Sequence, residues 1–164
     1  MNTIITKAAL AAALATASLS AHAAQTNITL TAEIDNTLTL LKADGSAIAD
    51  AVKLAYNPTR GLNPWGERVR IFSNDITSDV QVRLQAPVEL IPGSASGPNV
   101  PMSVQLGGRL LSTTPVEFTA AELYDGGLPN ASVAMDLGIA QTTAATLAAG
   151  SYEGMASIVL NVKP

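Results

Sequence analysis

The chain has 164 residues, with 13 acidic and 9 basic side chains, no cysteine and one histidine, His22. A negative net charge and an aromatic content of 4% argue against nucleic-acid binding, which depends on a basic surface. Without cysteine the fold cannot rely on disulfides, so packing or contacts with other chains must stabilise it.

The first 23 residues have the pattern of a secretory signal peptide. Lys7 precedes an apolar run rich in Ala and Leu, and Ala21-His22-Ala23 is a small-x-small cleavage site. The run is short for a bilayer span and no stop-transfer pattern follows it, which disfavours a membrane anchor. Cleavage after Ala23 leaves 141 residues with 8 basic and 13 acidic side chains, the size of one domain.

Residues 24–35 (AQTNITLTAEID) form the clearest alternation in the chain. The polar face carries Asn, Thr and Glu side chains, and the apolar face consists of Ile28, Leu30, Ala32 and Ile34. This period of two predicts a half-buried strand. A free-ended strand of this kind either completes its own sheet or is donated to a neighbouring molecule, and the alternation alone leaves both open.

Short strands separated by turn signals continue to the end of the chain. They are predicted at residues 36–41, 52–56, 67–72, 80–85, 102–106, 109–112, 132–140 and 152–162. Gly107-Gly108 predicts a hairpin turn, and residues 119–124 predict one or two helical turns. The inward positions of the two middle strands are Val69, Ile71, Val80, Val82 and Leu84. This spacing indicates one all-β domain, an antiparallel β-sandwich.

No constellation of catalytic or metal-binding residues is apparent. Removal of His22 with the leader leaves no His or Cys, the commonest general base, thiol nucleophile and transition-metal ligands. The turn aspartates, Asp44, Asp50, Asp75 and Asp79, lack the spacing of a calcium loop and are typical of local hydrogen bonding. Glu117 and Glu122 are interpreted as solvated side chains rather than a glycosidase pair. We therefore expect no enzyme activity, no cofactor and no metal.

The only tryptophan, Trp65, lies in a loop predicted at residues 59–66, with Arg60 and Arg68 nearby. A lone loop tryptophan is a candidate for a packing or subunit contact, or for a sugar-binding platform. We take Trp65 as a candidate surface contact.

Five runs together carry a family resemblance. They are residues 27–35 (NITLTAEID), 38–58 (LTLLKADGSAIADAVKLAYNP), 73–84 (SNDITSDVQVRL), 100–124 (VPMSVQLGGRLLSTTPVEFTAAELY) and 148–162 (AAGSYEGMASIVLNV). In this order and spacing they resemble the major pilins of class 5 fimbriae, the colonisation factor antigen I and cable-pilus type, assembled by the alternate chaperone–usher pathway. The resemblance extends over residues 24–164.

The resemblance implies an immunoglobulin-like antiparallel β-sandwich that lacks one strand. It divides the chain into a signal peptide (1–23), a donor strand (24–35) and a pilin domain (36–164). In such pilins the gap is filled first by a periplasmic chaperone and then by the N-terminal strand of the next subunit. The side chains that would fill it here are Ile28, Leu30, Ala32 and Ile34.

The resemblance also implies partners and a location. The partners are further copies of the chain, the periplasmic chaperone, an outer-membrane usher and a tip adhesin, and the route runs through the periplasm to a fimbria on the cell surface. One position departs from the pattern, because some members carry proline directly after the Asp that ends the donor strand, where this chain has Asn36. A proline would fix the backbone at that exit, and Asn36 does not.

Our main hypothesis is the structural major subunit of an adhesive fimbria, a pilus-shaft protein that polymerises by strand donation. One alternative is a self-contained exported β-sandwich that binds a carbohydrate, with Trp65 as the platform. In that case the leading strand would pair within its own domain and the monomer would be stable. Another alternative is a minor or tip fimbrial subunit, although tip adhesins are expected to be longer, with an added receptor domain.

Overall fold

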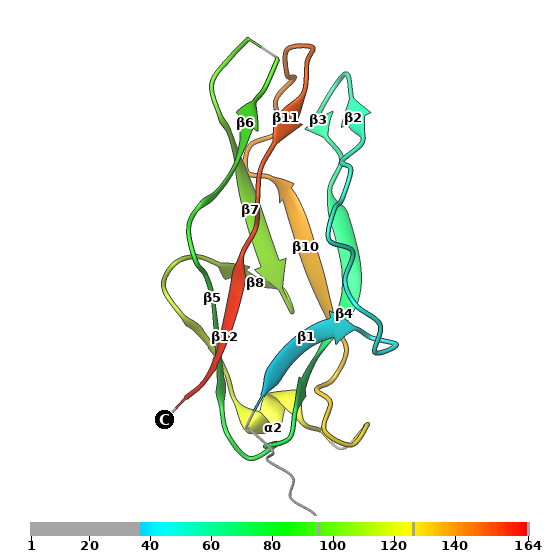
Figure 1. The fold of residues 1–164 in the computed structure, drawn as a ribbon, viewed down its shortest axis with the longest axis vertical. Helices are drawn as coiled ribbons and strands as arrows, with labels where there is room; N and C mark the ends of the chain where they lie inside the picture. The colour runs from blue at the N-terminus through cyan, green and yellow to red at the C-terminus, as the bar shows by residue number, and fades with distance from the viewer. Residues whose placement is uncertain (1–36, 95, 126, 164) are drawn as a thin grey trace, which may run out of the picture. The chain divides into compact units, whose positions relative to one another are not determined.

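The computed structural model describes residues 37–94, 96–125 and 127–163. The predicted signal peptide and the predicted strand with Ile28, Leu30, Ala32 and Ile34 lie outside these residues. The described chain is almost entirely β-structure (Figure 1). Its elements are β1 (Leu38–Lys42), β2 (Tyr56–Asn57), β3 (Gly61–Leu62), β4 (Trp65–Ser73), β5 (Val80–Leu84), β6 (Val88–Pro92), β7 (Val100–Leu106), β8 (Arg109–Leu111), β9 (Val116–Phe118), α2 (Ala120–Leu123), β10 (Met135–Gln141), β11 (Tyr152–Glu153) and β12 (Ile158–Val162).

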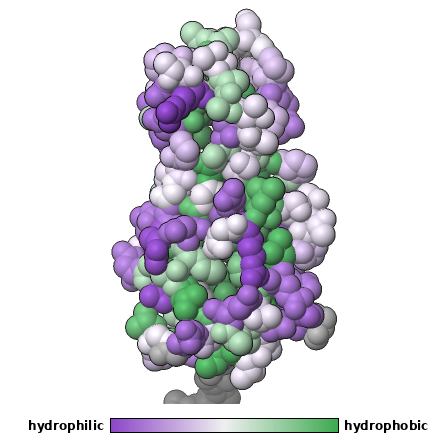
Figure 2. All heavy atoms as spheres, turned by 180° about the vertical axis from the view of Figure 1, so that it is seen from behind, coloured by the Kyte–Doolittle hydropathy of each residue, from purple (hydrophilic) through white to green (hydrophobic). Residues whose placement is uncertain are grey.

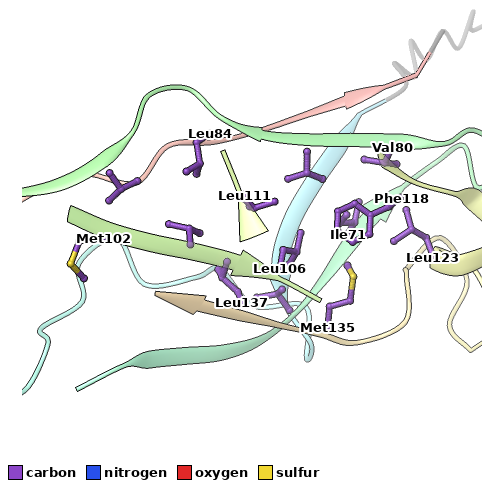
Figure 3. Packing of buried hydrophobic residues seen from close by; sticks show 14 of the residues in the cluster. Ile71, Val80, Leu84, Met102, Leu106, Leu111, Phe118, Leu123, Met135 and Leu137 are labelled. Carbon is purple, nitrogen blue, oxygen red and sulfur yellow. The ribbon is translucent and has the colours of Figure 1, made fainter. Parts of the chain in front are cut away.

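The strands form two facing layers. The larger sheet has the order β1-β4-β10-β7-β6-β11, with β8 also paired to β7, and the smaller sheet has the order β12-β5-β9. A separate short hairpin joins β2 to β3, and all of these pairings are antiparallel. Side chains from the two layers meet between them (Figure 3). The predicted antiparallel β-sandwich is therefore confirmed.

The core follows the predicted alternation. The five positions predicted to face inward, Val69, Ile71, Val80, Val82 and Leu84, are all at most 3% exposed. They pack with residues of β7, β10 and the β8–α2 region, among them Leu106, Leu111, Phe118, Leu123 and Leu137 (Figure 3). The alternation of apolar residues in strands with a covered face was sufficient to identify these positions.

Two chain segments pass from one sheet to the other. β5 and β6 are separated by only three residues, and they pair with β12 and β11, respectively. The strand predicted at residues 152–162 is consequently not continuous, because residues 154–157 are not in a strand. A Cβ atom on Gly154 would lie 2.2 Å from the Glu89 carbonyl oxygen, so the close approach at this crossing requires glycine.

The two predicted turns of special geometry are confirmed. Gly107 and Gly108 connect β7 to β8 and both have positive φ, 55° and 76°, as a two-residue hairpin turn of type I′ requires. The predicted helical turn is α2, which starts with a capping box: Thr119 accepts a hydrogen bond from the Glu122 N–H, and the Glu122 carboxylate accepts one from the Thr119 N–H.

Three strand boundaries differ from the predictions. The strand predicted at residues 52–56 is absent except for Tyr56, since residues 46–55 pair with no other strand. Trp65 begins β4 rather than lying in a loop. β10 starts at Met135, because the buried Ser132 hydroxyl accepts a hydrogen bond from the Ile71 N–H and donates one to the Val133 carbonyl, replacing part of the ladder.

Candidate functional site

Two strands at the side of the sandwich have only one hydrogen-bonded neighbour each among the described residues. β1 pairs with β4, and β12 pairs with β5. The remaining edges of β1 and β12 face each other, with some Cα atoms of the two strands less than 8 Å apart, but no ladder joins them (Figure 1). We call this arrangement the β1–β12 edge pair. It leaves two rows of backbone donors and acceptors without a strand partner, a ready template for another strand.

The side chains of the edge pair are aliphatic. Leu38 and Leu40 on β1, and Ile158 and Leu160 on β12, pack against the core cluster but are only partly buried. By contrast Val82, which lies opposite Leu160 on the neighbouring strand, is fully buried. The edge pair is thus apolar and only half covered. It suits an apolar strand and offers no group for chemistry.

Charged groups anchor the end of β12. The Lys163 ammonium lies 2.7 Å from a Glu117 carboxylate oxygen and 3.9 Å from one of Asp79, and the hydrogen bond to Glu117 raises the pKa of Lys163. The other Asp79 carboxylate oxygen accepts a hydrogen bond from the Ala120 N–H at the start of α2. β12, β5, β9 and α2 are therefore tied together beside the edge pair.

The carboxylates singled out from the sequence have local roles. Asp75 accepts hydrogen bonds from Ser78 and Thr77, which lower its pKa to about 2, and Ser46 similarly lowers the pKa of Asp44. Glu122 caps α2 and lies 2.6 Å from Arg109, while Glu117 binds Lys163. The two glutamates are held by different cations in separate contacts. Among the described residues, no group of three or more His, Cys, Asp or Glu side chains is arranged to hold a metal.

Trp65 is not a freely exposed platform. It stands opposite Ile139 of β10 and packs, partly buried, against the core. Its predicted neighbour Arg68 lies three residues along the same strand and pairs with Asp136 at 3.5 Å. A contact between Trp65 and another molecule stays a prediction. The error concerned its setting, because the Pro-containing segment before it was taken to extend as a loop through residue 66.

Two hollows indent the surface of the domain. One, of about 300 Å³, lies between residues 96–101 and 141–148 and includes Tyr152, and the other, of about 260 Å³, lies around Pro87, Pro101 and Leu110. The face seen in Figure 2 carries several apolar patches separated by polar side chains. Over the described ranges, no helix has the length and apolarity needed to cross a membrane.

Comparison with known proteins places these features in a family. The sequence model of the CS1 type fimbrial major subunit matches residues 24–161. The chain is 39% identical over 150 residues to the CFA/I fimbrial subunit of Escherichia coli O78:H11, covering 88% of both chains, and 33% identical over 159 residues to the CS1 fimbrial subunit of Escherichia coli, covering 92% and 93%. The chain belongs to the CS1-type fimbrial major subunits. The solved CooA pilin of enterotoxigenic Escherichia coli has a similar fold, with 30% identity and a TM-score of 0.68 over 77% of this chain and 87% of that chain.

Membership of the CS1-type fimbrial major subunits confirms the resemblance found in the sequence and the immunoglobulin-like character of the sandwich. The family consists of structural subunits of fimbriae, so association with further copies and a place in a surface fimbria follow in general terms. In this setting the β1–β12 edge pair is the feature of the described domain that can accept another chain.

Proposed function

We propose that this CS1-type pilin builds a pilus shaft by donating residues 24–35, the donor segment, to the β1–β12 edge pair of the next copy. The observation that carries the proposal is the pair of facing strand edges, each with one backbone ladder and aliphatic side chains that are only half covered. A strand placed between them would pair with both edges and cover those side chains.

The donor segment has the complementary pattern. Its apolar face would point toward the core, and burying four aliphatic side chains would contribute several kcal/mol, on the order of 1–3 for each larger one; these are Ile28, Leu30, Ala32 and Ile34. Two strands that flank a third lie about 9.5 Å apart. Since parts of β1 and β12 approach within 8 Å, the edges would separate slightly as the donor segment enters.

Register disfavours insertion of the donor segment beside its own β1. Residues directly opposite each other in an antiparallel pair share a face of the sheet. If residues 36–37 formed a two-residue hairpin turn, Asp35 would stand opposite Leu38 and Glu33 opposite Leu40. Both carboxylates would then point into the apolar interior, where burial of an unpaired charge is very costly.

A one-residue shift would restore the correct face but strain the turn. A three-residue connection, residues 35–37, would place Ile34 opposite Leu38. The third residue of such a hairpin adopts the left-handed conformation, and here it is Thr37. That conformation costs a β-branched residue about 1–2 kcal/mol or more. The spacing between the donor segment and β1 therefore favours donation to another molecule.

The remaining partners follow from the same physics. Unpaired apolar edges are an aggregation hazard, so a periplasmic chaperone that covers them before assembly is a natural partner. The leader at residues 1–23 supports export, and the family match from residue 24 agrees with a mature chain that begins there. Delivery through an outer-membrane usher to a shaft that carries a tip adhesin completes the proposal. The activity is assembly, with no enzyme chemistry.

The first test compares the mature protein, intact and without residues 24–35, by light scattering and electron microscopy. Fibres from the intact protein alone, together with a rise in melting temperature when the deletion variant binds a synthetic AQTNITLTAEID peptide, would support donation. A stable intact monomer, with a deletion variant that the peptide does not rescue, would overturn the proposal. Glycan binding at Trp65 would then be examined.

The second test reverses the register argument. In a variant with Asn36→Gly and Thr37 deleted, Ile34 and Leu38 flank an Asp-Gly turn, the preferred two-residue hairpin, with the apolar face inward. We expect this variant to be a stable monomer that neither forms fibres nor binds the peptide. Asn36→Gly alone is the matched control and should still polymerise. Equal polymerisation by both variants would contradict the role of the spacing.

A further inference from the structure

The end of the domain at which the N-terminal segment leaves is well defined. β1 begins at Leu38, opposite Ser73 at the end of β4. Around it lie residues 74–79, α2 and residues 127–130, with the Ser73 N–H donating to the Asn130 carbonyl (Figure 1). We call this the α2 end. It exposes two aliphatic side chains, Ile76 at 45% and Leu128 at 51%.

The opposite end is built around the β2–β3 hairpin. The Gln141 side chain accepts a hydrogen bond from the Leu62 N–H and donates one to the Ala145 carbonyl, both at 3.1 Å. The Tyr56 hydroxyl donates to the Leu147 carbonyl at 3.4 Å, although half of the Tyr56 surface is exposed. The hollow of about 300 Å³ lies in the same region, which we call the β2–β3 end (Figure 1).

Chain length requires two copies to approach closely in a fibre. The 12 residues of the donor segment span about 40 Å when extended, and the 11 residues of Tyr152–Val162, which run beside the acceptor position, span about 36 Å. The donor segment is therefore long enough to traverse the whole domain. Only residues 36–37 separate it from its own β1, and they reach about 7 Å. The α2 end of the donor must abut one end of the acceptor.

Fibre growth selects which end. If the donor segment left the acceptor at the acceptor's α2 end, that surface would have to contact both its own donor and its own acceptor. One surface cannot serve both neighbours in an open head-to-tail series, which needs two different surfaces. The segment therefore leaves at the β2–β3 end, and it runs antiparallel to β12 and parallel to β1.

We propose that the α2 end of each subunit docks on the β2–β3 end of the subunit that receives its donor segment. This inference rests on the proposed strand donation. The exposed Ile76 and Leu128 of one copy meet the exposed Tyr56 and the adjoining hollow of the next. Aromatic and aliphatic side chains that are half exposed in the single domain would be covered in the fibre.

The test uses the intact mature chain and the free AQTNITLTAEID peptide as a competitor. The measured quantity is the peptide concentration that halves fibre formation, seen by light scattering. In the double variant Ile76→Asp and Leu128→Asp, and separately in Tyr56→Asp, we expect this concentration to fall about tenfold, since the peptide then competes with a donor that has lost its end contact. Direct binding of the peptide should be unchanged.

Leu110→Asp is the matched control, because Leu110 is 59% exposed on β8, at the side of the domain. It should leave the half-inhibitory concentration at the wild-type value. If the end variants also keep the wild-type value, docking of the two ends is overturned while donation stands. If the peptide inhibits wild-type assembly at no concentration, strand donation itself fails, and the end contact fails with it.

Discussion

The centre and the side of the sandwich differ in how completely the same kind of strand is covered. β10 lies between β4 and β7, and its inward Leu137 is 3% exposed. β12 alternates in a similar way but has only β5 beside it, and its Ile158 and Leu160 remain partly exposed. Alternation therefore reports that a strand has an inner face, whereas full burial of that face also needs a neighbour on each side.

The largest expected effect lies at the centre. Leu106→Ala removes a fully buried side chain from β7 and should lower the free energy of unfolding by about 2–5 kcal/mol. Urea unfolding would measure the loss with and without the AQTNITLTAEID peptide. The loss should be the same in both states, because Leu106 is already fully covered. A loss that depends on the peptide would contradict the contrast between centre and side.

Leu160→Ala probes the edge pair directly. In the free subunit the partly exposed side chain should contribute about 1 kcal/mol, and with the peptide bound about 2–3 kcal/mol, as its burial becomes complete. The same urea titrations would show this difference. An equal loss in both states would mean that the peptide does not cover Leu160.

Ser132→Ala tests the start of the central strand. The substitution leaves the buried Ile71 N–H without its acceptor and should cost about 1–3 kcal/mol. Ser112→Ala is the matched control, because the Ser112 hydroxyl also accepts from a backbone N–H, that of Thr114, but is exposed. Thermal melting of the two variants should differ clearly. Equal melting temperatures would argue against a structural role for the Ser132 hydroxyl.

The smallest effect concerns pH. Hydrogen bonds from Ser78 and Thr77 lower the pKa of Asp75 from 3.8 to about 2, so its stabilising contribution is present above pH 3.8 and is lost as pH falls toward 2. Asp75→Asn should flatten the decline in melting temperature between pH 4 and pH 2. Asp50→Asn, at an exposed position, is the comparison. An unchanged decline in the Asp75 variant would contradict this role.

The sequence was most informative where strands have two neighbours or special turns. Val69, Ile71 and Val82 were placed inside from alternation alone, and Gly107-Gly108 identified its hairpin, because both signals depend on local geometry. Alternation at residues 52–56 was misleading, since a strand also needs a partner edge and none is paired there. A local pattern does not contain that information.

The breaks within strands depended on contacts between distant residues. Gly154 interrupts the last strand because it approaches Glu89, 65 residues earlier, and nothing in the run YEGMASIVLNV signals that contact. The apolar face of residues 24–35 was clear from the sequence, and the edge pair that can receive it appeared only when β1 and β12 were brought side by side.

β1 has a mechanical consequence for the proposed fibre. The strand forms one side of the edge pair and is also the first element after the donor segment, so a pulling force entering a subunit through the edge pair leaves it through Leu38. The five residue pairs between β1 and β4 would carry that load in shear, all at once, rather than by peeling. Single-fibre stretching would test this: Thr39→Pro, which removes a backbone donor from β1, should lower the rupture force. Tensile strength would then be concentrated in one short strand.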